Sequence, residues 1–159
     1  MLTVSDMKGV KDILAAMAQY EEEISALYAL CAERWPQDRD LWLTMSKDEL
    51  VHAERLRWLS HLLEENPGQF ELGRPFNRIA INTAISGVKK RREEIKNGFC
   101  PQEQAMAIAR DIEQSILESR YMEFLKTSNL EYVNTMRRLV EETGNHRKII
   151  QQQLEKIIK

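Results

Sequence analysis

Four long segments of the chain place apolar residues at alternating steps of three and four, the spacing of an α-helix that buries one face. All four prolines fall between helical segments or in a first helical turn, and Asn97-Gly98 forms a helix stop signal. No segment alternates apolar and polar residues as a half-buried strand would. The sequence therefore predicts an all-α protein with helices over about Val10–Arg34, Asp38–Glu65, Asn77–Lys96, Pro101–Thr127 and Asn129 to the end.

The order of these segments is two long helices, one shorter helix and two long helices. This order is typical of a four-helix bundle with a long crossover, here containing an extra helix, between its second and third long helices. A length of 159 residues, with 43% hydrophobic and 30% charged residues, suits one globular core. We therefore expect a single helical domain over residues 1–159.

Each apolar stripe is interrupted near its middle by a polar or ionisable residue that faces the core. A buried, unpaired carboxylate is strongly unfavourable, and three glutamates at one level would also repel one another. Divalent metal ions would supply positive charge and accept carboxylate and imidazole ligands. A buried hydrogen-bonded network is the alternative interpretation. The residues in question are Glu21, Glu49, His52, Glu113, Thr143 and His146.

The two halves of the chain also repeat one pattern. Lys11–Glu21 and Glu103–Glu113 are similar segments. Both carry alanines and a leucine or methionine at similar positions, and both end in a glutamate. The second and fourth long helices place His52 and His146 at corresponding steps, and the i, i+3 spacing of Glu49 and His52 puts both on one helix face. The repeat predicts two similar hairpins around a pseudo-symmetric polar centre.

With these motifs, Glu21-x6-Tyr28, Glu49-x-x-His52, Glu113 and His146, the sequence resembles the rubrerythrin-like branch of the ferritin-like superfamily. The resemblance covers nearly the whole chain in helix order and crossover placement. It implies an iron cofactor held between the helices, either a di-iron site or a single ion. The implied roles are terminal ligands for Glu21 and Glu113, a bridge for Glu49, imidazole ligands for His52 and His146, and hydrogen bonding to a bound ligand for Tyr28.

The same resemblance implies a non-haem iron oxidoreductase of the peroxidase or oxidase type, which acts on peroxide or dioxygen. The chain has two cysteines and so lacks the four-cysteine iron domain that often supplies electrons in this family. We therefore expect a separate electron donor, and a homodimer as the assembly.

Two residues depart from the family pattern. Thr143 stands where the fourth long helix would carry a glutamate, and Glu142 beside it is turned by about 100° and is expected to pair with Arg138. Arg120 stands where tyrosine is often found, and could neutralise Glu113 without a metal. The alternative function is therefore a degenerate bundle that binds one metal or none and acts as a structural or interaction module. The crossover helix argues against a storage cage.

Composition restricts the partners and the compartment. The formal net charge of −2 gives no general attraction to nucleic acid or to a membrane surface. No apolar run approaches the roughly 20 residues of a membrane span, and the first residues lack the pattern of a signal peptide. Cys31 and Cys100 form no C-x-x-C motif. We therefore expect a cytoplasmic protein.

Overall fold

Every predicted helix forms, and local signals fix where the first one begins. In the computed structural model, which describes residues 1–159, Thr3 caps the first helix. The backbone N–H of Asp6 donates to the Thr3 hydroxyl, and the N–H of Thr3 donates to the Asp6 carboxylate, each over 3.0 Å. This capping box starts the helix earlier than the predicted Val10. The helices are α1 Val4–Arg34, α2 Arg39–Glu65, α3 Arg78–Lys96, α4 Gln102–Ser119 and α5 Leu130–Ile158.

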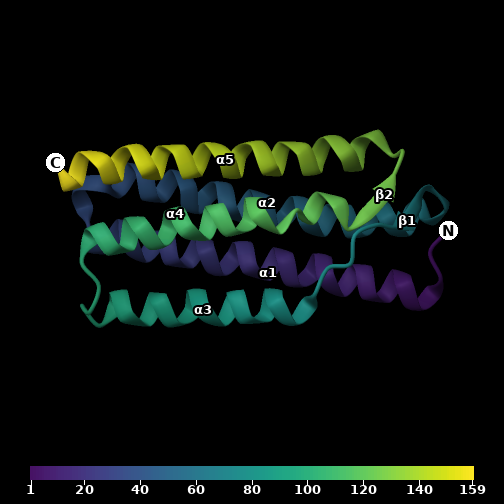
Figure 1. The fold of residues 1–159 in the computed structure, drawn as a ribbon, viewed down its shortest axis with the longest axis horizontal. Helices are drawn as coiled ribbons and strands as arrows, with labels where there is room; N and C mark the ends of the chain where they lie inside the picture. The colour runs from purple at the N-terminus through teal and green to yellow at the C-terminus, as the bar shows by residue number, and fades with distance from the viewer.

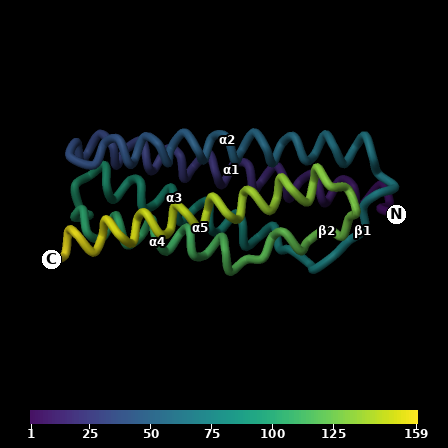
Figure 2. The backbone as a smooth tube through the Cα atoms, turned by 90° about the horizontal axis from the view of Figure 1, so that it is seen from above, coloured from purple at the N-terminus to yellow at the C-terminus, as the bar shows by residue number.

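The helices pack as an elongated bundle made of two hairpins. Helices α1 and α2 form one layer and α4 and α5 form the other (Figure 2). Helix α3 lies along α1 at the edge opposite α5, and the two chain termini lie at opposite ends of the bundle (Figure 1). The closest backbone packing is within each hairpin and between α1 and α3. The inward side chains of four helices therefore meet in the space between the hairpins. No helix combines the length and apolar character that crossing a bilayer requires.

The fourth helix is shorter than predicted, and the expectation of no strands was wrong. Helix α4 ends at Ser119 rather than near Thr127, and Arg120 follows with a left-handed φ of 53°. After a short 3-10 turn, strand β2, Leu125–Thr127, pairs antiparallel with β1, Phe70–Leu72, from the α2–α3 connection. Two further 3-10 turns, Pro36–Asp38 and Pro67–Gln69, flank α2.

A close backbone contact explains why the helical pattern is overridden there. The N–H of Gly73 donates to the carbonyl of Phe124 over 2.9 Å. A Cβ atom at Gly73 would lie 2.3 Å from the Glu123 carbonyl oxygen, so only glycine fits this approach. The pairing buries Phe70 and Leu125, whereas Arg120 is exposed. Tertiary pairing of an irregular segment thus outweighs the local preference for helix.

Candidate metal centre

The buried carboxylates and imidazoles all gather in the middle of the bundle. None of these five residues is more than 3% exposed, and four helices contribute them. No other aspartate, glutamate, histidine, lysine or arginine of the chain is buried. They are the five residues that the sequence pattern singled out as ligands: Glu21 from α1, Glu49 and His52 from α2, Glu113 from α4 and His146 from α5.

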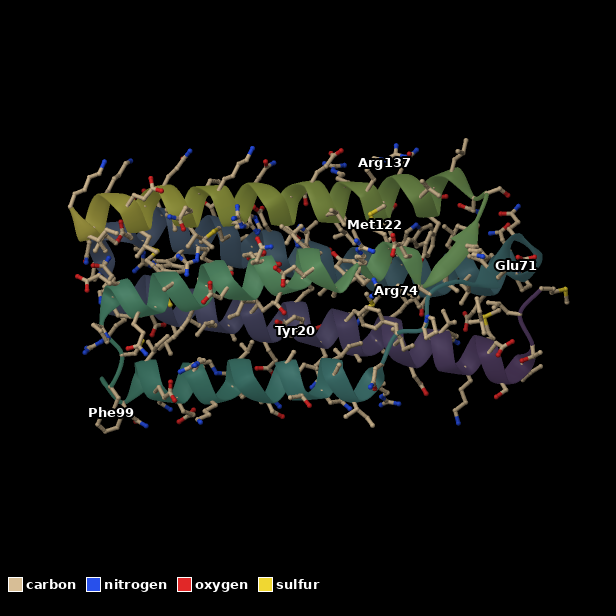
Figure 3. All side chains as sticks on the ribbon, viewed as in Figure 1. Tyr20, Glu71, Arg74, Phe99, Met122 and Arg137 are labelled. Atoms are coloured by element: carbon tan, nitrogen blue, oxygen red, sulfur yellow. The ribbon has the colours of Figure 1, made fainter.

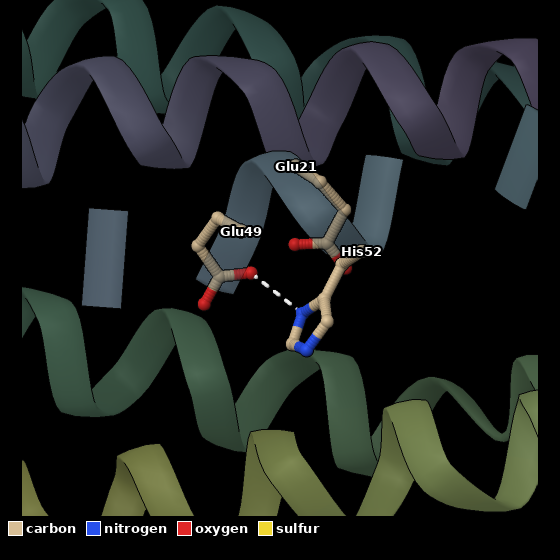
Figure 4. Close-up of side chains that lie close together, drawn as sticks. All are labelled: Glu21, Glu49 and His52. Carbon is tan, nitrogen blue, oxygen red and sulfur yellow. Dashed lines mark hydrogen bonds and ion pairs between the residues drawn. The ribbon is translucent and has the colours of Figure 1, made fainter. Parts of the chain in front are cut away.

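Glu49 lies between the two histidines. Its Oε2 is 2.9 Å from Nδ1 of His52, and its Oε1 is 2.7 Å from Nδ1 of His146. Figure 4 shows the first of these contacts, with the Glu21 carboxylate beside the same pair. One carboxylate thus contacts a histidine from each hairpin.

The five residues form two groups that share Glu49. Glu21, Glu49 and His52 make one group, and Glu49, Glu113 and His146 make the other. Within each group, one ligand atom from every residue lies within 4.8 Å of the others. Each group offers two carboxylates and one imidazole, a donor set that suits iron and similar divalent metals. The two groups are neighbours that could each hold a metal ion, with the Glu49 carboxylate common to both.

Several buried polar atoms of this centre have no hydrogen-bond partner. They are Oε2 of Glu21, Oε2 of Glu113, Oε1 of Glu49 and Nδ1 of His146. The last two lie 2.7 Å apart as an ion pair, although their geometry is not that of a hydrogen bond. Buried, unpartnered oxygens are rare and cost free energy. A metal ion would be a common partner for these atoms, so the residues present fit one.

Each histidine also contacts a second carboxylate that the sequence interpretation missed. Nε2 of His52 is 2.7 Å from Oε2 of Glu142, and Nε2 of His146 is 3.0 Å from Oδ2 of Asp48. Asp48 and Glu142 each lie four residues before a histidine, and each contacts the histidine of the opposite hairpin. The repeat itself contained this signal, as an acidic residue at the same position in both copies.

Glu142 makes the predicted contact as well. Its Oε1 is 3.3 Å from Nε of Arg138, one helical turn away, and its Oε2 is 2.8 Å from a guanidinium nitrogen of Arg55. Two arginines therefore hold the carboxylate that orients His52.

Burial and mutual charge set the protonation of this centre. Burial opposes ionisation of Glu49, but contacts with His146 and His52 outweigh it and lower its pKa. Burial likewise opposes the imidazolium form, but contacts with Glu113 and Glu49 raise the pKa of His146 to about 11. Burial and the charge of Glu49 raise the pKa of Glu113 to about 7 and also raise the pKa of Glu21. Without metal, the histidines are therefore favoured as imidazolium ions beside Glu49, and Glu21 and Glu113 ionise less readily than exposed glutamates.

Tyr28 joins the two hairpins. Its buried hydroxyl donates to Oε1 of Glu113 over 2.6 Å. The hydroxyl therefore bonds the glutamate of the opposite hairpin, Glu113, and makes no hydrogen bond to Glu21.

Arg120 and Thr143, the two residues that depart from the resembling pattern, take different positions in the fold. Arg120 does not neutralise Glu113, because the early end of α4 leaves it exposed and without an ion pair. The buried tyrosine next to it, Tyr121, faces the centre instead, and both burial and the charge of Glu21 raise its pKa. Thr143 is buried, and its hydroxyl donates to the carbonyl of Leu139 over 2.9 Å. The fourth long helix therefore supplies an imidazole but no buried carboxylate.

Comparison with known proteins gives no relative for this chain: no protein-family model, no curated protein and no solved structure matches it.

Proposed function

We propose that the chain binds two ferrous ions between its hairpins and belongs to the rubrerythrin-like branch of the ferritin-like superfamily. Glu21 and His52 would hold one ion, Glu113 and His146 the other, and Glu49 would bridge them. The observation that supports this most strongly is the pair of buried ligand groups that share Glu49 and contain unpartnered oxygens.

The carboxylates of Glu142 and Asp48 orient both histidines for metal binding. Glu142 and Asp48 each accept a hydrogen bond from an Nε2–H, which leaves the Nδ1 lone pair directed at the centre once its proton is lost. Metal would displace the Nδ1 protons of the two imidazolium groups, so binding and proton release are linked. Tyr28 holds Oε1 of Glu113 and leaves the other oxygen free for an ion.

Bound ferrous ions would supply the electrons that reduce peroxide or dioxygen, so we propose a non-haem iron oxidoreductase. Oxygen and imidazole donors without a thiolate suit iron in such a role. On the family resemblance, we further propose a homodimer that receives electrons from a separate protein, and on the composition we propose a cytoplasmic location.

A second candidate function rests on the contacts that form without metal. His52 donates a good hydrogen bond to Glu49, and Tyr28 donates one to Glu113. With Thr143 in place of a fourth carboxylate, the centre could be a salt-bridged network in a structural module that binds one ion or none.

Iron stoichiometry separates the two candidates. Metal-free protein would be loaded with ferrous iron without oxygen, desalted and measured by elemental analysis. We expect about two iron ions per chain, with strong loss in Glu49→Gln. Ser46→Ala, which removes a buried hydroxyl from the same helix outside the centre, is the matched control and should keep its iron.

Peroxide turnover tests the chemistry separately. Loaded protein should consume hydrogen peroxide as its ferrous iron is oxidised. Fewer than one ion per chain would favour the structural module, and loaded protein inert to both peroxide and dioxygen would overturn the oxidoreductase assignment.

A further inference from the structure

An apolar pocket connects the solvent to the Glu21 side of the centre. It has a volume of about 150 Å³, and α1, α2, α3, α4 and the segments beside β1 and β2 contribute to its walls. Most of the lining is apolar, including Leu56 and Ile116. Ala80 of α3 and Ser115 of α4 line it and are exposed, so it opens between these helices. Tyr20, labelled in Figure 3, lies on α1 in this gap.

The inner end of the pocket holds two buried polar groups without partners. Oε2 of Glu21 and the hydroxyl of Tyr121 make no hydrogen bond, although the two residues are only 3% and 5% exposed. Both residues line the pocket. The Thr143 hydroxyl lies near Tyr121 but donates to the Leu139 carbonyl. Ser119, which also lines it, is already satisfied, because its hydroxyl donates to the Ile116 carbonyl over 2.6 Å. The polar atoms of the pocket that lack a hydrogen bond are thus those of Glu21 and Tyr121, at its inner end.

The pseudo-symmetry of the bundle shows what is missing at this end. Tyr28 of α1 donates directly to Glu113 of α4, so this bond crosses between the hairpins. The repeat aligns Arg120 with Tyr28, but Arg120 is exposed. The tyrosine that lies beside Glu21 is the next residue, Tyr121, which makes no hydrogen bond to Glu21. A hydroxyl group can donate one hydrogen bond and accept two, so one bound hydroxyl could satisfy both side chains.

We propose that this pocket binds a small, uncharged organic molecule with an apolar body of about one aromatic ring and a single hydroxyl, which donates to Glu21 and accepts from Tyr121. The size follows from the volume, because an apolar cavity of about 150 Å³ takes up a molecule such as benzene. The binding itself does not depend on metal. A role for the molecule as a substrate rests on the proposed function, since Glu21 also belongs to the metal centre.

The pocket also predicts which molecules are rejected. A carboxylate on the ring would be desolvated among apolar walls and placed next to Glu21, so an anion of the same size should not bind. A ring without a hydroxyl would fill the same volume but leave Glu21 and Tyr121 unpartnered. Phenol, benzene and benzoate are therefore the informative probes.

Calorimetric titration of metal-free and iron-loaded protein with these probes tests the proposal. We expect phenol to bind both forms about tenfold more tightly than benzene, and benzoate not to bind detectably. Ala84→Phe, which fills the pocket from α3, should abolish phenol binding. Asn82→Phe, on the same helix outside the pocket, is the matched control and should retain it.

Two further measurements keep the test independent of how Ala84→Phe folds. Tyr121→Phe should lower phenol affinity towards that of benzene. In methionine-methyl spectra, phenol should shift the signal of Met17, which lines the pocket, and leave that of Met136 unchanged. Equal affinities for phenol and benzene, or shifts away from Met17, would overturn the proposal. Because iron content is measured separately, phenol binding with no iron would refute the metal centre and leave the pocket intact.

Discussion

The imidazole of His52 links Glu49 at the centre of the bundle to Glu142 on the opposite hairpin, with contacts of 2.9 and 2.7 Å at its two nitrogens. The pair His146 and Asp48 repeats this link in the opposite direction. Each hairpin thus orients the histidine of the other. The orientation of both potential ligands depends on the two hairpins being docked together.

This link predicts that Glu142→Gln weakens iron binding without removing a ligand. An amide can still accept a hydrogen bond, but it lacks the charge that makes the imidazole a better ligand, and loss of such a contact costs about tenfold or more in metal affinity. Competition with a chelator would measure the affinity. The neighbouring exposed Glu141→Gln is the control. Equal affinities of the two variants would show that Glu142 plays no part in metal binding.

Removal of the Tyr28 hydroxyl should destabilise the metal-free protein. Tyr28→Phe would leave Oε1 of Glu113 buried without its donor, at a cost of about 1–3 kcal/mol. Tyr132→Phe is a matched control, because its buried hydroxyl has no partner to lose. Urea unfolding of both variants would measure the difference. Similar unfolding free energies for the two would contradict a stabilising role for the Tyr28–Glu113 bond.

The stability of the metal-free protein should fall as pH rises above neutrality. Contacts with Glu113 and Glu49 raise the pKa of His146 from 6.5 to about 11 in the folded state, despite burial. Burial and the charge of Glu49 raise that of Glu113 from 4.5 to about 7. A raised pKa stabilises the fold below the unfolded value, and this contribution is lost as pH rises through the folded value. The stabilisation from Glu113 is therefore lost between about pH 4.5 and 7, and that from His146 between about pH 6.5 and 11.

Denaturant unfolding at pH 6 and pH 9 would test this dependence, with His146→Gln expected to show a smaller decrease. Iron should reverse the trend, because its ligands must be deprotonated and its affinity therefore rises with pH. Metal-free protein that is equally stable at both pH values would show that His146 is not held as an imidazolium.

Sequence periodicity was sufficient for the order of the helices and for the buried polar centre, because both depend on which residues share one helix face. The five predicted ligand positions do lie together, although metal binding by them is still a prediction. Asp48 and Glu142 were harder to recognise, because they sit at the edge of the stripe and reach across to the other hairpin.

Arg120 and Tyr121 could not be placed from periodicity at all. Their positions depend on where α4 ends, and a strand pairing between segments far apart in the sequence decides this. A helical pattern that continues past Ser119 contains no information about that pairing.

The contact at Gly73 should therefore be essential for the fold at this end of the bundle. In Gly73→Ala the new Cβ would lie 2.3 Å from the Glu123 carbonyl oxygen, so the backbone must shift and the β1–β2 pairing must weaken. We expect a loss of more than about 1 kcal/mol of stability, together with weaker phenol binding as Tyr121 moves. Gly68→Ala, in the same connection, meets no atom within 4 Å and should change stability by less than about 0.5 kcal/mol. Thermal unfolding of the two variants would compare them, and equal midpoints would show that the strand pairing does not hold Tyr121 in place.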